Sequence, residues 1–460
     1  MSGPGPRQGV DRRRTRRRRT VVALAAVAAI AVGASPATAG ATAGATAEVS
    51  ADRHLLVADP AAQRLYTYRV SDLRRTGHLD GVELAAHAGT VLLPDGRLLF
   101  VDDEQGQVVA LTVDGRGRPT VQQRIDIPGE RPWEGAVWAA VDPGANYFAV
   151  TSGYDESPEQ TVTVVDLFDY SVGQLPVTLD RNAAGGFDEL HVWLAGQPLQ
   201  VVVSTGGRLR SYGLQEVMAG RSPAETSSAP AGPGTHGPVL SRDGDRLLVT
   251  TTEGVDRVRI VGDQLRDHRT IPYPGPGPLL QNYRPRLAQD GRTLYGPISR
   301  VEGLRPEQWA QTSNRLHTVD LTTETARTAP LPAGIVGRSA QSARHALFPV
   351  IGGQQDTAAF VDVDRSSPQF RSVVRSVRLQ PLTKGPRPGT ASAGTERRSA
   401  AITTRGDRGF VSHGGDGLIS VVEPGRAAVR QTVRTPTPLR GGGYLVVVEP
   451  GRALVDVLAR

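Results

Sequence analysis

Histidine, carboxylate and arginine side chains recur at one position of a repeated sequence pattern, shortly before a turn. Imidazole and carboxylate groups bind transition metals or exchange protons, and guanidinium groups bind anions. The set therefore predicts a ligand pocket for an anion or a metal, provided that the fold gathers these positions. Its members are His87, Glu134, His191, His236, Tyr283, Arg284 and Arg398.

The nine histidines contain no local ligand pair, because none lies two or four residues from another. A zinc site would have to be assembled from separate repeats. His87, His191 and His236 are then the best ligands, with Glu134 as a fourth. No metal or other cofactor is favoured on this ground, and zinc is the alternative.

Catalytic motifs are absent from the sequence. There is no G-x-S-x-G motif, and Lys384, the only lysine, does not follow the glycines of a phosphate-binding loop. The chain has no cysteine, which excludes disulfides, thiolate metal sites and cysteine nucleophiles. We therefore assign no catalytic residue. An enzyme would have to use His87, His236 and Glu134 as acid–base groups.

The pattern that carries these residues is a turn, a short apolar strand, a polar break and a second strand that ends on an acid. Pro94-Asp95-Gly96 followed by 97–101 is one copy, and 243–249 and 290–295 are others. Turns of this kind recur at spacings of 36 to 62 residues, with a mean close to 49. Their positions are Asp52, Asp95, Pro143, Gln197, Asp243, Asp290, Arg344, Gly406 and Gly442.

This period predicts an all-β fold, a single β-propeller of four-stranded blades. Eight blades are favoured and seven are the alternative. The last hairpin (444–448 with 454–458) is expected to share a blade with the first (55–57 with 65–70), so that N- and C-terminal strands close the ring. The polar positions above then lie at the mouth of the central channel, because they begin the innermost strands. Trp138 and Trp193, on the same strands, are interpreted as core.

Residues 48–460 are predicted to form one propeller domain, because the repeat continues through the whole segment. Three stretches rich in small residues or proline, 220–238, 272–278 and 381–396, are expected to be loop insertions between strands. The strongest helical signal is a turn at 214–219.

The N-terminus has the order of a secretory signal peptide: arginines, an apolar run at 21–32, then small residues. Cleavage is expected after residue 39, with sites after 43 or 47 as alternatives. The pair Arg18-Arg19 fits the minimal twin-arginine pattern, which would mean export of a folded chain. We expect a secreted or extracytoplasmic protein without a membrane span after cleavage.

The net charge of +7 comes from this leader. Residues 1–39 hold eight arginines and one aspartate, which leaves 45 basic and 45 acidic residues in the remainder. Nucleic-acid binding needs a surplus of positive charge on the folded domain, so this class of function is excluded.

The repeat resembles the YVTN-type and quinoprotein-amine-dehydrogenase-like propellers of exported bacterial proteins, over nearly the whole mature chain. A narrower likeness is carried by Leu190-His191-Val192-Trp193, Gly206-Gly207-Arg208-Leu209, 214–220, Gly234-Thr235-His236-Gly237 and Asp243-Gly244. This order is similar to the secreted zinc metallochaperones that hand metal to the binding protein of a zinc importer. The resemblance implies that His191 and His236 are channel ligands. The histidine-rich segment of that family is missing here.

Three functions follow as hypotheses. The first is an exported, monomeric, non-enzymatic propeller that binds a small molecule, a cell-wall glycan or another exported protein at its channel mouth or loops. The alternative is a zinc metallochaperone, and the third is a propeller lyase or lactonase.

Overall fold

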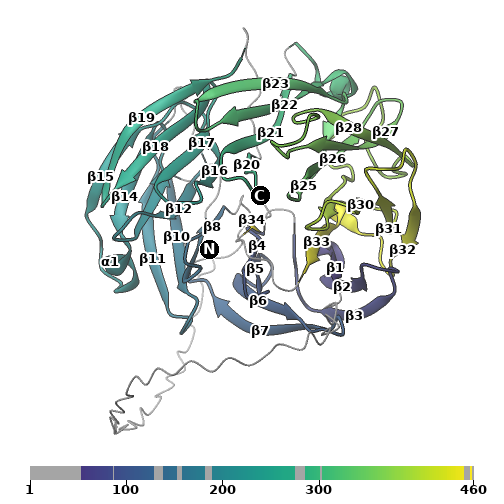
Figure 1. Ribbon diagram of the computed structural model, residues 1–460. Helices are drawn as coiled ribbons and strands as arrows, with labels where there is room; N and C mark the ends of the chain where they lie inside the picture. Colours follow the sequence, from purple (N-terminus) through teal and green to yellow (C-terminus); the bar gives the residue numbers. More distant parts are fainter. Residues whose placement is uncertain are drawn as a thin grey trace, which may run out of the picture. The chain divides into compact units, whose positions relative to one another are not determined.

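The computed structural model describes residues 53–85, 88–128, 138–152, 158–181, 189–274, 285–300, 303–449 and 456–457. Ser50–Arg460 form one compact unit. Its described strands make eight antiparallel sheets that stand around a central axis as the blades of a propeller (Figure 1). The predictions of an all-β fold and of eight blades are therefore confirmed.

The first half of the ring contains blades 1 to 4, whose strands are given from the inside outward, except that β34 lies inside β4 in blade 2. Blade 1 is β33 (Tyr444–Val448), β1 (His54–Asp59), β2 (Arg64–Arg69) and β3 (Arg75–Asp80); blade 2 is β4 (Val91–Leu92), β5 (Leu98–Asp102), β6 (Gln107–Val113) and β7 (Pro119–Asp126), with β34 (Asp456–Val457) beside β4; blade 3 is β8 (Ala139–Val141), β9 (Tyr147–Ser152), β10 (Glu159–Asp166) and β11 (Val172–Thr178); blade 4 is β12 (His191–Ala195), β13 (Gln200–Ser204), β14 (Arg208–Gly213) and β15 (Glu225–Pro230).

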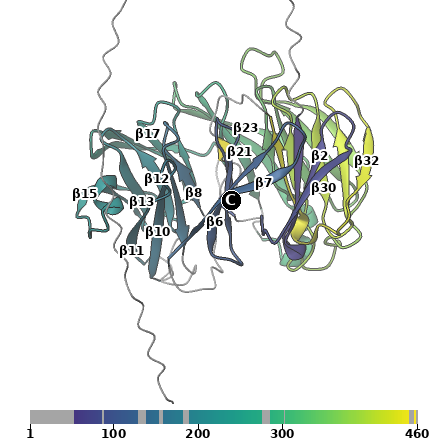
Figure 2. The same cartoon turned by 90° about the horizontal axis from the view of Figure 1, so that it is seen from below.

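The second half contains blades 5 to 8, and Figure 2 shows the sheets side by side from below. Blade 5 is β16 (His236–Leu240), β17 (Arg246–Thr250), β18 (Gly254–Val261) and β19 (Gln264–Pro272); blade 6 is β20 (Arg286–Leu287), β21 (Thr293–Arg300), β22 (Ser313–Asp320) and β23 (Thr325–Leu331); blade 7 is β24 (Ile335–Val336) and β25 (Ala340–Gln341), both on β26 (His345–Ile351), then β27 (Asp356–Asp362) and β28 (Val373–Leu379); blade 8 is β29 (Ala400–Ile402), β30 (Gly409–His413), β31 (Leu418–Val422) and β32 (Gln431–Arg434).

Helices are few in the described part of the chain. They are α1 (Leu214–Met218) and three 3₁₀ turns, η1 (Pro60–Ala62), η2 (Pro306–Gln311) and η3 (Arg440–Gly442). The predicted helical turn at 214–219 thus contains α1. None of the described helices has the length and hydropathy needed to cross a bilayer.

The Asp-Gly turns form because each residue type meets a separate geometric need. In the turn between β4 and β5, Gly96 has a φ of +87°, which side chains with a Cβ rarely adopt. Asp95 Oδ1 accepts a hydrogen bond from the backbone N–H of Arg97 at 2.9 Å. The acid that ends the third strand of a blade acts similarly: Asp166 Oδ1 accepts the N–H of Phe168 at 2.8 Å. The repeated acids therefore stabilise the turns.

The apolar core lies between the blades. Among the described residues, eight hydrophobic clusters each join side chains of two neighbouring sheets, one cluster for each interface around the ring. Phe100, Phe148, Phe348 and Phe410 are fully buried in them. Burial of such a side chain contributes about 1.5–3 kcal/mol, so the blades stabilise one another by face-to-face packing.

The ring closes by pairing of β33 with β1. The antiparallel register places Val448 opposite His54 and Leu445 opposite Val57. This confirms that residues 444–448 join the first hairpin in one blade. The second half of the last hairpin does not: Asp456 of β34 lies opposite Leu92 of β4, in blade 2. The prediction that 454–458 shares blade 1 is therefore wrong for β34, because blade 1 already has its four strands in β33, β1, β2 and β3.

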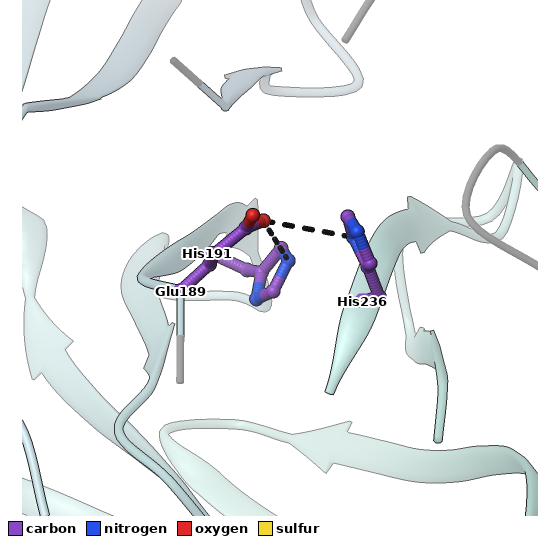
Figure 3. Close-up of side chains that lie close together, drawn as sticks. All are labelled: Glu189, His191 and His236. Carbon is purple, nitrogen blue, oxygen red and sulfur yellow. Dashed lines mark ion pairs between the residues drawn. The ribbon is translucent and has the colours of Figure 1, made fainter. Parts of the chain in front are cut away.

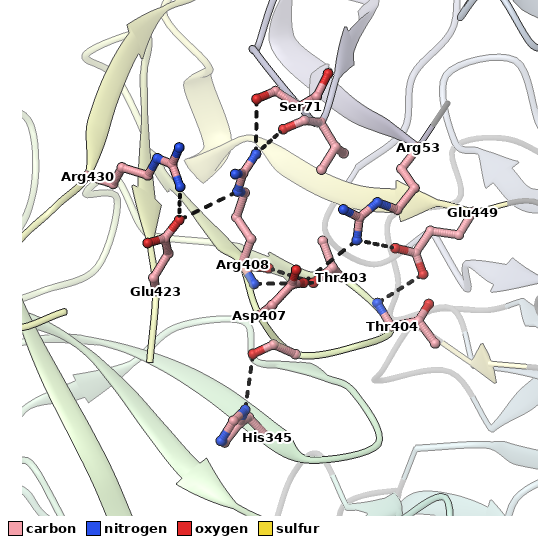
Figure 4. Close-up of polar contacts among 12 residues, drawn as sticks. Arg53, Ser71, His345, Thr403, Thr404, Asp407, Arg408, Glu423, Arg430 and Glu449 are labelled. Atoms are coloured by element: carbon pink, nitrogen blue, oxygen red, sulfur yellow. Dashed lines mark hydrogen bonds and ion pairs between the residues drawn. The ribbon is translucent and has the colours of Figure 1, made fainter. Parts of the chain in front are cut away.

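A polar network supports this closure (Figure 4). Glu449, directly after β33, accepts the backbone N–H of Thr404 at 2.9 Å and lies 3.5 Å from Arg53 Nη1. Arg408 of blade 8 donates to the carbonyl oxygens of Val70 and Ser71 in blade 1. Arg53, Glu449 and the segment 70–71 thus all contact blade 8 through polar or charged groups.

Residues 220–238 were predicted to be a loop. This prediction is wrong at the centre of the segment, where β15 pairs with β14. β15 is the outermost strand of its blade and is rich in serine. An outer strand needs backbone pairing on one side and no apolar face, so its composition carried no strand signal. Residues 381–396, also predicted to be a loop, contain no strand. In the third predicted loop, 272–278, Pro272 ends β19, and 275–278 lie outside the described residues. Residues 1–39 also lie outside them.

One buried histidine has no polar partner. His317 on β22 is fully buried, and neither ring nitrogen has a hydrogen-bond partner among the described residues. Its ring packs edge-on against Tyr273, with centroids 4.8 Å apart. Burial lowers the pKa of His317 to about 4, because desolvation disfavours the imidazolium. His317 is therefore a neutral core residue.

Replacing Glu449 by glutamine should loosen the closure. The Glu449→Gln variant loses the charge that faces Arg53 and the charge-assisted bond from Thr404. We expect the free energy of unfolding to fall by about 1–2 kcal/mol, measured by urea denaturation. Glu253→Gln, at an exposed position, is the control. An equal loss in both variants would contradict a specific role for Glu449.

His317 should make the protein less stable in acid. In the unfolded chain its pKa returns to about 6.5, so the unfolded state binds more protons between about pH 4 and 6.5 and stability falls as the pH drops through this range. His317→Gln should remove up to about 3 kcal/mol of this acid dependence, measured by urea denaturation at several pH values. The exposed-site variant His78→Gln should retain it; an unchanged slope in His317→Gln would refute the assignment.

Candidate metal centre

Two neighbouring inner strands bring a carboxylate and two imidazoles together (Figure 3). His191 is the first residue of β12, His236 is the first residue of β16, and Glu189 lies two residues before His191. Glu189 Oε2 lies 3.9 Å from His191 Nε2 and 3.7 Å from His236 Nδ1. The three potential ligand atoms all lie within 4.8 Å of one another.

The fold explains this convergence. Residues two apart in an extended chain point to the same side, so Glu189 and His191 share a face. The innermost strands of successive blades stand around the central axis (Figure 1), and β12 and β16 contact each other there. The position of His236 is held further by Thr250, whose hydroxyl donates to the His236 carbonyl oxygen at 2.6 Å.

Burial differs across the three residues. The side chain of His191 is fully buried and that of His236 is 9% exposed, whereas the side chain of Glu189 is 23% exposed. Solvent therefore reaches the centre from the side of the carboxylate.

Trp138 covers the centre with its indole ring. Its centroid lies 4.5 Å from that of His191 and 5.1 Å from that of His236, and the two imidazole centroids are 5.7 Å apart. The indole N–H donates to Glu189 Oε2 at 3.0 Å. The ring restricts both imidazoles and orients the carboxylate between them. Its apolar body also lowers the local dielectric, which strengthens charge interactions.

Ser204 on β13 fixes the orientation of His191. Its hydroxyl donates to the carbonyl oxygen of Glu189 at 3.5 Å, and its Oγ lies 2.9 Å from His191 Nδ1. In the tautomer that carries its hydrogen on Nδ1, the ring donates this hydrogen to Oγ. The lone pair of the ring is then on Nε2, which faces Glu189. A hydrogen-bonded outer nitrogen of this kind is typical of histidine metal ligands.

The donor set fits a tetrahedral transition metal. Two ligands at the usual zinc distances and at a tetrahedral angle lie about 3.4 Å apart. The two distances from the Glu189 carboxylate exceed this by 0.5 Å and 0.3 Å, and all three ligand atoms lie within 4.8 Å of one another, so the side chains must draw together to bind a metal. Within the described ranges, this is the only group of three such ligand atoms.

The structure brings together two of the residues predicted for the channel mouth, His191 and His236. Four others lie outside the described residues: His87, Glu134, Tyr283 and Arg284. A contribution of His87 or Glu134 as further ligands, and the acid–base set built on them, thus stay predictions.

Arg398, the remaining predicted mouth residue, is 1% exposed and makes internal contacts. Its Nη2 and Nε lie 2.6 Å and 3.0 Å from Asp356 Oδ2, and it also donates to the carbonyl oxygens of Gln380 and Ser412. A buried guanidinium paired in this way joins blades 7 and 8, and removal of one partner would leave a buried charge.

Glu189, Trp138 and Ser204 were not among the predicted site residues. A search for pairs of histidines misses Glu189, although its spacing of two residues from His191 is a ligand-pair signal on an extended chain. Trp138 was interpreted as core, and it is buried, but its indole N–H serves the carboxylate. Nothing in the sequence places Ser204 next to His191, because their contact depends on the pairing of β12 with β13.

Comparison by sequence finds no matching family model and no matching curated protein. Among solved structures, apo AztD from Citrobacter koseri superposes with a TM-score of 0.59 at 13% identity, over 86% of this chain and 98% of that one. A second structure of the same protein gives a TM-score of 0.57 at 14% identity, with the same coverage.

Dihydro-heme d1 dehydrogenase NirN, in complex with DHE, is also similar, with a TM-score of 0.52 at 15% identity over 89% of this chain and 77% of that one. At these identities the likeness concerns the fold. The chain therefore has the propeller architecture of AztD and NirN, in agreement with the resemblance in its sequence.

Proposed function

We propose that this protein is an extracytoplasmic zinc carrier that binds the metal through Glu189, His191 and His236. The observation that carries the proposal is the convergence of these three ligand atoms within 4.8 Å of one another. It favours the metallochaperone hypothesis over a binding protein for an unspecified ligand. The signal-peptide pattern of residues 1–39 supports export.

The donor set favours zinc over other metals. Calcium and magnesium prefer oxygen ligands, whereas two imidazoles and one carboxylate suit zinc and its neighbours in the transition series. Zinc takes four ligands in protein sites and has no preferred geometry of its own, so it tolerates a site built from two separate strands.

The arrangement suits a cargo that is taken up and released. Three protein ligands leave a fourth coordination position for water or for a donor group of an acceptor protein. The partial exposure of the Glu189 side chain puts that exchange on the solvent side, while His191 is held in the interior. Transfer to the binding protein of a zinc importer, which the sequence resemblance implies, would use this open side.

Zinc titration tests the proposal. The chelator-treated protein should bind one zinc ion per chain, measured by calorimetry and by metal analysis after desalting. Glu189→Gln, His191→Ala and His236→Ala should each weaken binding by more than about 100-fold, because loss of a direct ligand exceeds the 10- to 100-fold effect of losing an outer partner. Binding should also weaken in acid, since the ligands must be deprotonated.

His78→Gln is the matched control, because His78 is exposed on the outer strand β3. It should bind zinc as the unmodified protein does. A protein that takes up no zinc, or three ligand variants that keep full affinity, would refute the carrier function.

The contact with Ser204 gives a second prediction. Ser204→Ala removes the acceptor for His191 Nδ1–H and should weaken zinc binding by about 10- to 100-fold, because the imidazole loses its fixed orientation. Ser211→Ala, in the same blade and also buried, is the control and should bind zinc normally. Equal affinities of the two serine variants would contradict the assigned role of Ser204.

A further inference from the structure

A cavity lies between the inner strands of blades 6, 7, 8 and 1. It is separate from the candidate metal centre, which lies on blades 4 and 5. Its empty volume is about 400 Å³, which includes space open to solvent. Arg286 begins β20, Arg338 and Ser339 precede β25, Ser399 precedes β29, and Tyr444 begins β33. These polar residues occupy the first positions of inner strands, as His191 and His236 do in blades 4 and 5.

Guanidinium groups are the charged side chains of the described lining. Two of them, Arg286 and Arg338, line the cavity, and its described lining contains no carboxylate. Arg338 is 8% exposed, and its guanidinium carbon lies 4.7 Å above the centre of the Tyr444 ring. Arg286 Nη2 donates to the carbonyl oxygen of Ser339 at 3.2 Å, and this bond holds the Arg286 guanidinium beside Ser339 in the cavity lining. Charges in such a dehydrated place attract anions more strongly than surface charges do.

Neutral hydrogen-bonding groups complete the lining. The hydroxyl of Ser399 is buried and has no hydrogen-bond partner among the described residues, an arrangement that is costly unless a ligand or water satisfies it. Gln341 accepts the Tyr295 hydroxyl hydrogen at 2.5 Å through its amide oxygen, so the remaining groups of this amide are N–H donors.

We infer that this cavity binds a small oxyanion, a molecule with a carboxylate or phosphate group, through Arg286, Arg338 and Ser399. Guanidinium groups recognise both kinds of oxyanion by paired N–H bonds, and the free hydroxyl adds a donor. The inference stands apart from zinc binding, because no residue of this cavity belongs to the Glu189–His191–His236 centre.

Calorimetry with two probes, inorganic phosphate and malonate, tests the inference at constant ionic strength near neutral pH. At least one probe should bind at millimolar concentration. Arg338→Gln and Arg286→Gln should each weaken that binding at least about tenfold, as expected for loss of a charge-assisted contact. The probe that binds more tightly identifies the anion as a phosphate or a carboxylate.

Two further variants sharpen the test. Arg266→Gln, at an exposed position on the outermost strand β19, controls for the loss of one positive charge and should bind as the unmodified protein does. Ser399→Ala should weaken anion binding several-fold without loss of folding, because it removes a buried hydroxyl that has no partner among the described residues. Should Arg338→Gln not fold, Arg286→Gln and Ser399→Ala decide the question.

Absence of binding by both probes would overturn the inference, and so would binding that survives in Arg286→Gln and Ser399→Ala. Zinc titration of Arg286→Gln distinguishes this failure from failure of the carrier proposal, since that variant should bind one zinc ion whether or not the oxyanion site exists.

Discussion

The pairing of β33 with β1 is the constraint on which the rest of the structure depends. A sheet of four short strands cannot cover both of its apolar faces by itself, and each blade here finds its cover in the two adjacent blades. That arrangement is complete only when the last blade meets the first. The five residue pairs between β33 and β1 provide this closure in a single sheet built from both ends of the described chain.

Closure also determines what chemistry the channel mouth can perform. Once the inner strands are held around one axis, their first residues face a shared space. The positions that begin β12 and β16 then bring two imidazoles and a carboxylate into contact, and the positions near β20, β25 and β29 bring arginines to a cavity. The starts of the inner strands thus carry the candidate metal ligands in blades 4 and 5, and arginines in blades 6 and 7.

The metal centre shows how the fold supports individual ligands. Trp138, before β8, contacts both imidazoles and donates to Glu189, while Ser204 Oγ on β13 lies 2.9 Å from His191 Nδ1. These supports come from blades 3 and 4, and His236 comes from blade 5. Packing of three blades is therefore needed to hold one small site, which makes its geometry sensitive to the core between the blades.

The sequence was sufficient to predict the ring, because Asp-Gly turns and strand-ending acids serve local hydrogen bonds that recur in every blade. It also predicted that His191 and His236 belong to one site, and the structure brings these two residues together. It did not predict Glu189, because only pairs of histidines were considered, nor Ser204, whose contact depends on strand register. The strand β15 was missed because an outermost strand carries little apolar signal. Arg398 was predicted as a ligand-binding residue of the mouth, and the structure pairs it with Asp356 of the neighbouring blade, a contact between strands that the sequence does not reveal.

The central claim is that the mouth of blades 4 and 5 holds one zinc ion. Crystals of the zinc-loaded protein, measured on both sides of the zinc absorption edge, would test it most directly. The account predicts one strong anomalous peak, about 2.0–2.2 Å from Glu189 Oε2, His191 Nε2 and His236 Nδ1. Zinc located at other residues, with these three side chains uncoordinated, would contradict it.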